Sequence, residues 1–221
     1  LVSWLNNFSA WYHIAVVGIL FGALAYKGFA QPISFLKTFH VSEGLNPSYG
    51  FLIGLLLAQW TLTGYDAAAH VSEETVNPRK NAPWGIFIAV AVSAIVGFLM
   101  IAAVTLSISD LSQAAAFGDQ ALTQILKQRL GETQGTTIVA LIAGAMWLCG
   151  LATMTSASRM VYAFARDGGL PFSKVWAKVG SHQTPANAIW GLAVFATLLA
   201  LSVSVYSAVV SIDTIALYLS Y

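Results

Sequence analysis

Long stretches of this chain contain no Asp, Glu, Lys or Arg, and they limit its fold more than any other feature. Hydrophobic residues make up 57% of the 221 positions and charged residues 9%, whereas charged residues form about 25% of an ordinary soluble domain. A helix needs roughly 20 mostly apolar residues to cross a bilayer core. The sequence therefore predicts an all-α membrane protein whose surroundings are the lipid bilayer.

The composition also excludes several classes of protein. With a formal net charge of +1 and no basic face, the chain has no electrostatic basis for binding nucleic acid. Cys149 is the only cysteine, so no internal disulfide can form. The sequence has no Gly-rich phosphate loop, nucleophile elbow or His/Cys metal spacing. We therefore expect no catalytic residue, no metal site and no cofactor.

Six apolar stretches are candidate membrane helices of a single transmembrane domain that covers residues 1–221. They are 11–27, 49–74 (broken near 63–66), 84–106, 137–165, 188–201 and 206–221. The segment 110–134 is too polar to cross a membrane, although part of it has helical spacing. Because the chain opens without an initiator Met or signal peptide and stops inside an apolar stretch, we expect it to be a piece of a longer polypeptide.

The second stretch is interrupted by the run Thr63-Gly64-Tyr65-Asp66. Irregular backbone within lipid is tolerated only where it is buried in protein or lines a cavity. The first half-helix would end in free carbonyls, which suit an ammonium group, and the second would begin with free N–H groups, which suit an anion. This predicts a site for a zwitterion or small amine. The alternative is a glycine kink that only helps helices to pack.

Five residues at the break are candidates for substrate binding. Thr61 and Thr63 offer hydroxyls, Gly64 lets a ligand approach the backbone, and Trp60 and Tyr65 offer flat apolar walls.

Asp66 is a separate candidate, because an ionisable residue inside a membrane span is costly and is functional by default. We predict a role in coupling or pH sensing. The alternative is a structural hydrogen bond to a neighbouring helix.

A group of charged residues follows the break. His70, Glu73 and Glu74 share one helical face but do not match the zinc-binding His-Glu-x-x-His pattern. We expect Glu73 and Glu74 to pair with Arg79, Lys80 or a basic residue of the fourth apolar stretch, so these four residues are candidates for a gate. A solvated charged face is the alternative.

Basic residues indicate which side of the membrane this group faces, because Lys and Arg are enriched in cytoplasmic loops. One side of the predicted topology carries six of them and the other carries four. The larger set is Arg79, Lys80, Arg159, Arg166, Lys174 and Lys178, and the smaller set is Lys27, Lys37, Lys127 and Arg129. The turn that holds Arg79 and Lys80 is therefore expected to be cytoplasmic.

Hydroxyl residues cluster near the end of the fourth apolar stretch. Serine and threonine in a helix commonly bond carbonyls of their own helix. The alternative is that Thr155 and Ser156 contribute to a cation site beside the broken helix.

Two motifs resemble those of a known family. The run from Trp60 to Pro83, with its Gly-Tyr-Asp, its Glu-Glu pair and its Asn-Pro-Arg-Lys-Asn-Ala-Pro turn, resembles helix six and the next loop of amino acid permeases. The run 158–171, which ends in Arg-Asp-Gly-Gly-Leu-Pro, resembles the end of their helix eight. These are permeases of the amino acid, polyamine and organocation superfamily. The sequence of the first motif is most similar to that of the branch that includes GABA and choline permeases.

The resemblance implies a fold of two inverted five-helix repeats. The chain would hold helices five to ten, which are the second repeat and the last helix of the first. Helix one, which supplies glycine-rich backbone for the substrate carboxylate in the family, would lie outside it, so the missing N-terminal repeat is an expected partner.

The resemblance also implies roles for individual residues. Trp60 matches the aromatic that packs on substrate, and Thr61 and Thr63 fall in the substrate-facing segment. Asp66 stands where relatives often have Glu, at a position associated with pH sensing and coupling. The stretch 14–26 lacks the lysine that some proton-coupled relatives carry, so the coupling ion, H+ or Na+, stays open.

The predicted function is secondary active transport of amino acids or related small amines across the plasma membrane by alternating access. One alternative is a sensor or channel-like protein with the same fold. The other is a membrane-embedded hydrolase using His13, His70 and Asp66. The hydrolase is the weaker of the two, because no nucleophile lies beside a base at a recognisable spacing.

Overall fold

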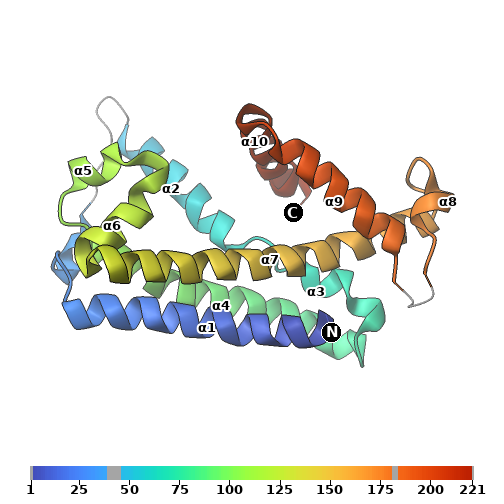
Figure 1. Cartoon of the computed structure of the whole chain (residues 1–221), viewed down its shortest axis with the longest axis horizontal. Helices are drawn as coiled ribbons and strands as arrows, with labels where there is room; N and C mark the ends of the chain where they lie inside the picture. Colours follow the sequence, from blue (N-terminus) through green and yellow to red (C-terminus); the bar gives the residue numbers. More distant parts are fainter. Residues whose placement is uncertain (1, 39–45, 181–183, 221) are drawn as a thin grey trace. The chain divides into compact units, whose positions relative to one another are not determined.

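The computed structural model describes residues 2–38, 46–180 and 184–220. These residues form helices, turns and loops and contain no strand. The longer helices are α1 (Val2–Lys27), α2 (Pro47–Leu62), α4 (Pro78–Leu106), α7 (Glu132–Arg166), α9 (Ala186–Ala200) and α10 (Val203–Ser220), as Figure 1 shows. The chain divides into two compact units, Leu1–Leu151 and Ala152–Tyr221.

Three helices in the described residues are long and apolar enough to cross a membrane: Trp4–Lys27, Pro78–Leu106 and Glu132–Arg166. Within the most apolar 18-residue stretch of each helix, only 22%, 11% and 11% of the residues, respectively, are buried inside the chain. Apolar surface left in water costs about 25 cal/mol per Å². Their outward faces therefore suit lipid or further apolar helices.

All three of these helices begin before the apolar stretches that predict them. α1 starts at Val2 and not near residue 11, α4 starts at Pro78 and not at 84, and α7 starts at Glu132 and not at 137. The hydropathy pattern marks only the part of a helix that suits lipid, whereas the helix itself continues until a residue breaks it. Gly131, with φ +91°, is that residue before α7.

The best-packed part of the first unit is built by α6 (Ala121–Leu130), the helix that is too polar to cross a membrane. Its apolar face packs against α1, α4 and the start of α7. The buried cluster there consists of Leu20, Leu24, Ala103, Leu126, Leu130 and Ile138. A short polar helix thus supplies core residues at one end of three long ones.

Polar bonds join the same ends. The backbone N–H groups of Ala30 and Gln31 both donate to the carbonyl of Leu106, each at 2.9 Å. Arg129 Nε donates to the carbonyl of Gly28 at 2.9 Å. Because helix-end carbonyls have no partner within their own helix, these bonds satisfy them and hold the ends of α1, α4 and α6 together.

Short helices fill the connections. They are η1 (Ile33–Lys37), α5 (Leu111–Ala116) and η3 (Gly118–Gln120). Asp110 caps α5 by accepting hydrogen bonds from the backbone N–H groups of Ser112 and Gln113. The Ser112 hydroxyl and these N–H groups lower the pKa of the Asp110 carboxyl.

In the second unit, α7 ends in the Arg-Asp-Gly-Gly-Leu-Pro run. Gly168 has φ +78° and its N–H donates to Ala165 O at 3.0 Å, while Gly169 N–H donates to Phe164 O at 2.8 Å. This is the Schellman pattern, in which a left-handed glycine lets the chain turn back on the last helical carbonyls. The chain then forms α8 (Ser173–Trp176) before α9.

Gly135, in the first turn of α7, touches α6 directly. A Cβ at this position would lie 2.7 Å from Lys127 Cα and 2.8 Å from Lys127 N. Both are backbone atoms, so α6 itself would have to move. Gly150, in the same helix, has nothing within 4 Å of its Cβ position.

We expect Gly135→Ala to lower the free energy of unfolding by about 1 to 3 kcal/mol, the usual cost of overpacking. Gly150→Ala is the matched control and should leave it unchanged or raise it slightly, because alanine favours helix. Thermal unfolding of the purified protein in detergent measures both. Equal unfolding temperatures for the two variants would contradict the α6–α7 contact.

Candidate functional site

The candidate site is the interruption between α2 and α3 (Ala67–His70). The α-helix stops at Leu62, turns cover residues 63–66, and helix resumes at Ala67. Gly64 has φ +85°, a value that a residue with a Cβ adopts only at a cost. Its carbonyl accepts from Ala67 N–H at 3.2 Å. The change of direction thus depends on one glycine.

Helix α4 supports both sides of the interruption. A Cβ added to Gly97 of α4 would lie 3.0 Å from Thr61 Cγ2, and a Cβ added to Gly85 would lie 3.4 Å from Ala68 Cβ. Small residues let helix backbones approach closely in membranes. These two glycines therefore set how near the broken helix lies to α4. Sequence analysis did not identify them, because their partners are distant in the chain.

Asp66 and His70 form a pair across one turn. His70 Nε2 lies 3.5 Å from Asp66 Oδ2, and the side chains are 28% and 33% exposed, respectively. The carbonyl of Asp66 accepts from the N–H groups of Ala69 and His70 at 2.8 and 3.3 Å. Sequence analysis grouped His70 with the glutamates that follow it and missed this pair. The spacing of four residues could have indicated it.

The other predicted substrate residues lie on the same segment. Thr61 and Gly64 are exposed, while Thr63 and Tyr65 are half-buried. The backbone of Trp60 belongs to α2, but its side chain lies outside the described residues.

The gate candidates follow within a short stretch of chain. Glu73 and Glu74 are exposed in η2 (Ser72–Glu74), and Arg79 and Lys80 are exposed in the first turn of α4. Asn77 joins these two elements in a left-handed conformation, with φ +51°.

The cation-site candidates Thr155 and Ser156 are half-buried on α7 in the second unit. The carbonyl of Thr155 accepts hydrogen bonds from the Ser158 hydroxyl at 3.1 Å and from Arg159 Nη1 at 3.0 Å. Ser158 therefore bonds a carbonyl of its own helix, which is the ordinary role of a helical hydroxyl.

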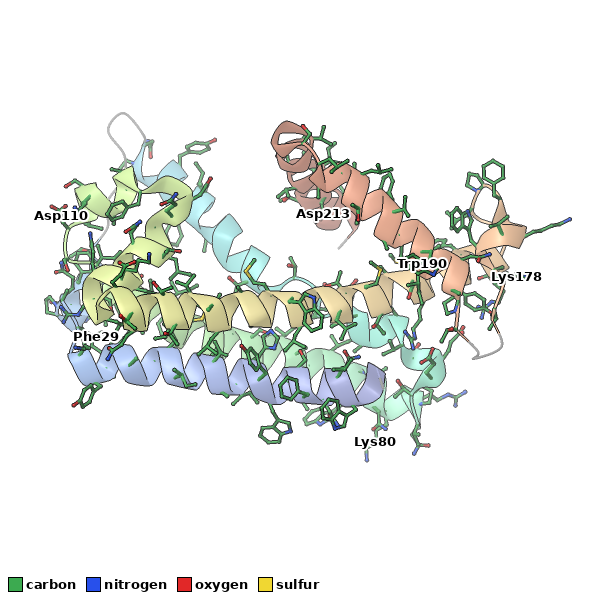
Figure 2. The ribbon with its side chains drawn as sticks, viewed as in Figure 1. Phe29, Lys80, Asp110, Lys178, Trp190 and Asp213 are labelled. Carbon is green, nitrogen blue, oxygen red and sulfur yellow. The ribbon has the colours of Figure 1, made fainter. Side chains whose placement is uncertain are left out.

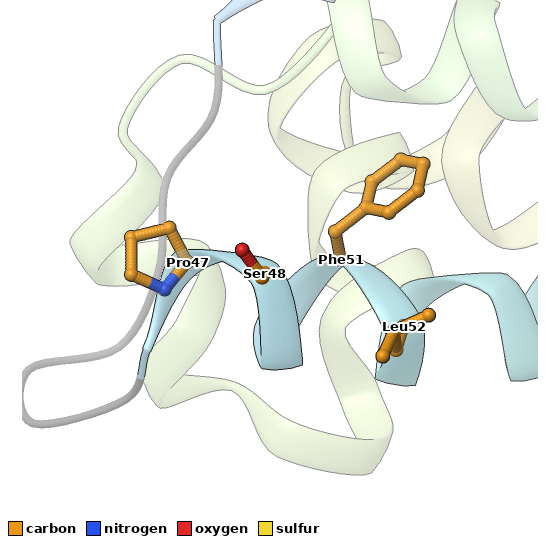
Figure 3. Close-up of a pocket in the computed structure, with 4 residues that line it drawn as sticks. All are labelled: Pro47, Ser48, Phe51 and Leu52. Atoms are coloured by element: carbon orange, nitrogen blue, oxygen red, sulfur yellow. The ribbon is translucent and has the colours of Figure 1, made fainter.

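Neither of two other features offers a site. In the described parts of the chain, no three His, Cys, Asp or Glu side chains gather where a metal ion could bind. The hollow beside the first turn of α2 is lined by Pro47, Ser48, Phe51 and Leu52 (Figure 3). All four come from a single helix and no other described element lines the hollow, so it is not a candidate substrate site.

Comparison with known proteins decides the class. The profile of the family described as amino acid permease matches residues 1–221. The chain belongs to the amino acid permease family. A rice protein named amino-acid permease BAT1 homolog is 36% identical over 100% of this chain and 46% of its own length. The Arabidopsis amino-acid permease BAT1 is 40% identical over 83% of this chain and 39% of its length.

A baker's yeast protein named GABA-specific permease is 36% identical over 68% of this chain and 27% of its own length. No solved structure matches the chain. The chain thus spans less than half the length of these relatives. Its family consists of permeases and not enzymes, so the hydrolase alternative is wrong. The apolar helices of this permease indicate a multi-pass membrane protein.

The left-handed conformation of Gly64 leads to a prediction about hydrogen exchange in the segment around it. Gly64→Ala places a Cβ on a left-handed residue, which costs about 1 to 2 kcal/mol. Gly54→Ala is the matched control, because Gly54 lies in α2, has no positive φ and has nothing within 4 Å of its Cβ position. Hydrogen exchange measured by mass spectrometry should speed up across residues 61–70 in the first variant only. Unchanged exchange there would show that the turn does not need glycine.

Proposed function

We propose that this permease is a secondary active transporter that moves amino acids or related small amines across the plasma membrane by alternating access. The observation that carries the proposal is the break at Gly64 in a member of the amino acid permease family. Broken membrane helices commonly form the substrate sites of secondary transporters.

The chemistry at the break supports an amino acid as substrate. The carbonyl end of α2 suits an ammonium group. The N–H groups of Ala67, Ala69 and His70 already bond the carbonyls of Gly64 and Asp66, so the partner of a substrate carboxylate would come from the N-terminal repeat. Thr61, Thr63 and Tyr65 add hydroxyls at the break, and the aromatic residue Trp60 would supply an apolar wall. The relatives named as amino-acid permeases and as a GABA-specific permease fit the same class of ligand.

The proposed fold is the five-plus-five inverted repeat. In it, α1 is helix five, α2 with α3 is helix six, and α4 and α7 are helices seven and eight. α9 and α10 then complete the second repeat. The N-terminal repeat, from outside this chain, would supply the other half of the substrate site. Transport is favoured over a sensor or channel-like role, because the relatives are named permeases.

In the proposed cycle, Asp66 carries the coupling or pH-sensing function, with H+ or Na+ as the coupling ion. Its contact with His70 places a second titratable group beside the carboxylate. Glu73, Glu74, Arg79 and Lys80 would form a cytoplasmic gate, and Thr155 with Ser156 would take part in a cation site if Na+ is the ion.

Uptake measurements test the transport function. The full-length protein in proteoliposomes should accumulate one or more members of a panel of labelled amino acids and GABA. Trp60→Ala should raise the KM or abolish uptake, because a substrate-packing aromatic contributes about 1 to 3 kcal/mol. Trp11→Ala, a change of the same size at an exposed position of α1 outside the proposed site, is the control. If no compound in the panel is either transported or bound, the proposed transport function is refuted.

The role of Asp66 has its own test. If protonation of this carboxyl is part of the cycle, wild-type uptake rises as pH falls. Asp66→Asn cannot titrate, so it should flatten the pH profile of uptake. Asp119→Asn removes an exposed carboxylate from η3 and should keep the wild-type profile. An unchanged profile in the Asp66 variant would leave Asp66 a structural residue.

A further inference from the structure

A groove in the second unit is lined by none of the proposed substrate residues. One wall is the segment that follows α7, with Phe172, Val175 and Trp176, and the other is a face of α9 that includes Val194, Phe195 and Leu198. Every one of these six residues except Trp176 is exposed. Phe172 is 79% exposed and Phe195 60%. Large apolar side chains that line an open groove mark a surface for an apolar partner.

The local structure holds this groove open. Trp176 Nε1 donates to Pro171 O at 3.0 Å, and Asn187 Nδ2 donates to Val175 O at 2.8 Å. Gly191 gives the Trp176 ring room, because a Cβ there would lie 2.4 Å from Trp176 Cζ3. The wall formed by α8 is thus fastened to the start of α9 by one side-chain bond, from Asn187, and one close packing contact, at Gly191.

Two lysines lie next to the α8 wall of the groove in the sequence, and that wall meets the start of α9 through the bond from Asn187 to Val175. Lys174 and Lys178 are exposed and flank Val175 and Trp176 in the sequence. Lys178 and Trp190 both lie near the start of α9 (Figure 2). The lysines thus place positive charge beside the wall formed by α8, whereas the face of α9 from Val194 to Leu198 that lines the groove is apolar.

The length of the groove matches one leaflet of a membrane. Between Asn187 and Leu198, α9 rises about 16 Å at 1.5 Å per residue. Half of a bilayer hydrocarbon core is about 15 Å. Lysines and tryptophans near the start of α9, followed by an apolar groove of this length, complement the charge of an anionic phospholipid and match the length of its acyl chain.

We propose that the groove binds an anionic phospholipid of the surrounding bilayer. Its phosphate lies at Lys174 and Lys178, and one acyl chain lies along Val194, Phe195 and Leu198. Phe172 and Trp190 border the chain at the level of the headgroup. Binding of this lipid would hold α8 against α9, and it requires only that the protein be embedded in a membrane.

Photo-cross-linking tests the proposal. The photoreactive residue p-benzoylphenylalanine replaces Val194 in the full-length protein, which is placed in phosphatidylcholine vesicles that contain phosphatidylglycerol as a minor component. Each lipid is radiolabelled in turn. Phosphatidylglycerol should be cross-linked well above its mole fraction. The same label at Leu198 gives a second position if the first variant does not fold.

The charge requirement is tested by Lys174→Gln with Lys178→Gln. This double variant should lower phosphatidylglycerol labelling toward the mole fraction of that lipid. The loss should be at most roughly fivefold for each lysine. The control pair Lys27→Gln with Lys37→Gln removes the same charge elsewhere and should leave labelling unchanged. Labelling at the mole fraction in the wild-type background, or cross-links to another protein segment or a second copy in place of lipid, would overturn the proposal. Uptake is not the readout, so the result is independent of the transport assay.

Discussion

The requirement that backbone polar groups be paired within a bilayer governs this structure. In the described residues it leaves α-helices as the elements that can cross, and it makes any interruption costly. The chain accepts one interruption, at Gly64, and supports it by packing the helical segments on either side against α4. Gly85 and Gly97 permit that contact because neither carries a side chain. The candidate site therefore depends on Gly64 in the turn and on two glycines of α4.

The stabilising core of the first unit lies elsewhere. It gathers where α6 packs on α1, α4 and α7, and it includes Leu24 and Leu126, which are fully buried. By contrast, the residues around Gly64 are half-buried or exposed. The first unit is therefore packed most tightly where α6 meets the long helices, and less tightly at the break. The hydrogen bond from Tyr12 to the carbonyl of Leu141, at 3.0 Å, adds a contact between α1 and α7.

Basic side chains serve different purposes in the two units. Arg129 satisfies a helix-end carbonyl, and Lys127 pairs with Glu132 at 2.7 Å. Lys174 and Lys178 instead extend from an exposed segment beside apolar side chains. Such cations at the rim of an apolar groove are placed to bind a lipid headgroup. A permease of this kind thus uses positive charge both inside its fold and toward its surroundings.

The sequence by itself determined the features that depend on local composition. Hydropathy predicted a membrane protein, and two motifs identified the amino acid permease family, which the comparisons confirm. The left-handed Gly64 and the glycine stop after α7 follow from residues adjacent in the chain, so they could be read without a fold. The tertiary structure alone decided the contacts of Gly85, Gly97 and Gly135, the pairing of Asp66 with His70, and the burial of α6. Each depends on how the backbone folds, because hydropathy records how apolar a segment is and not which segment it meets.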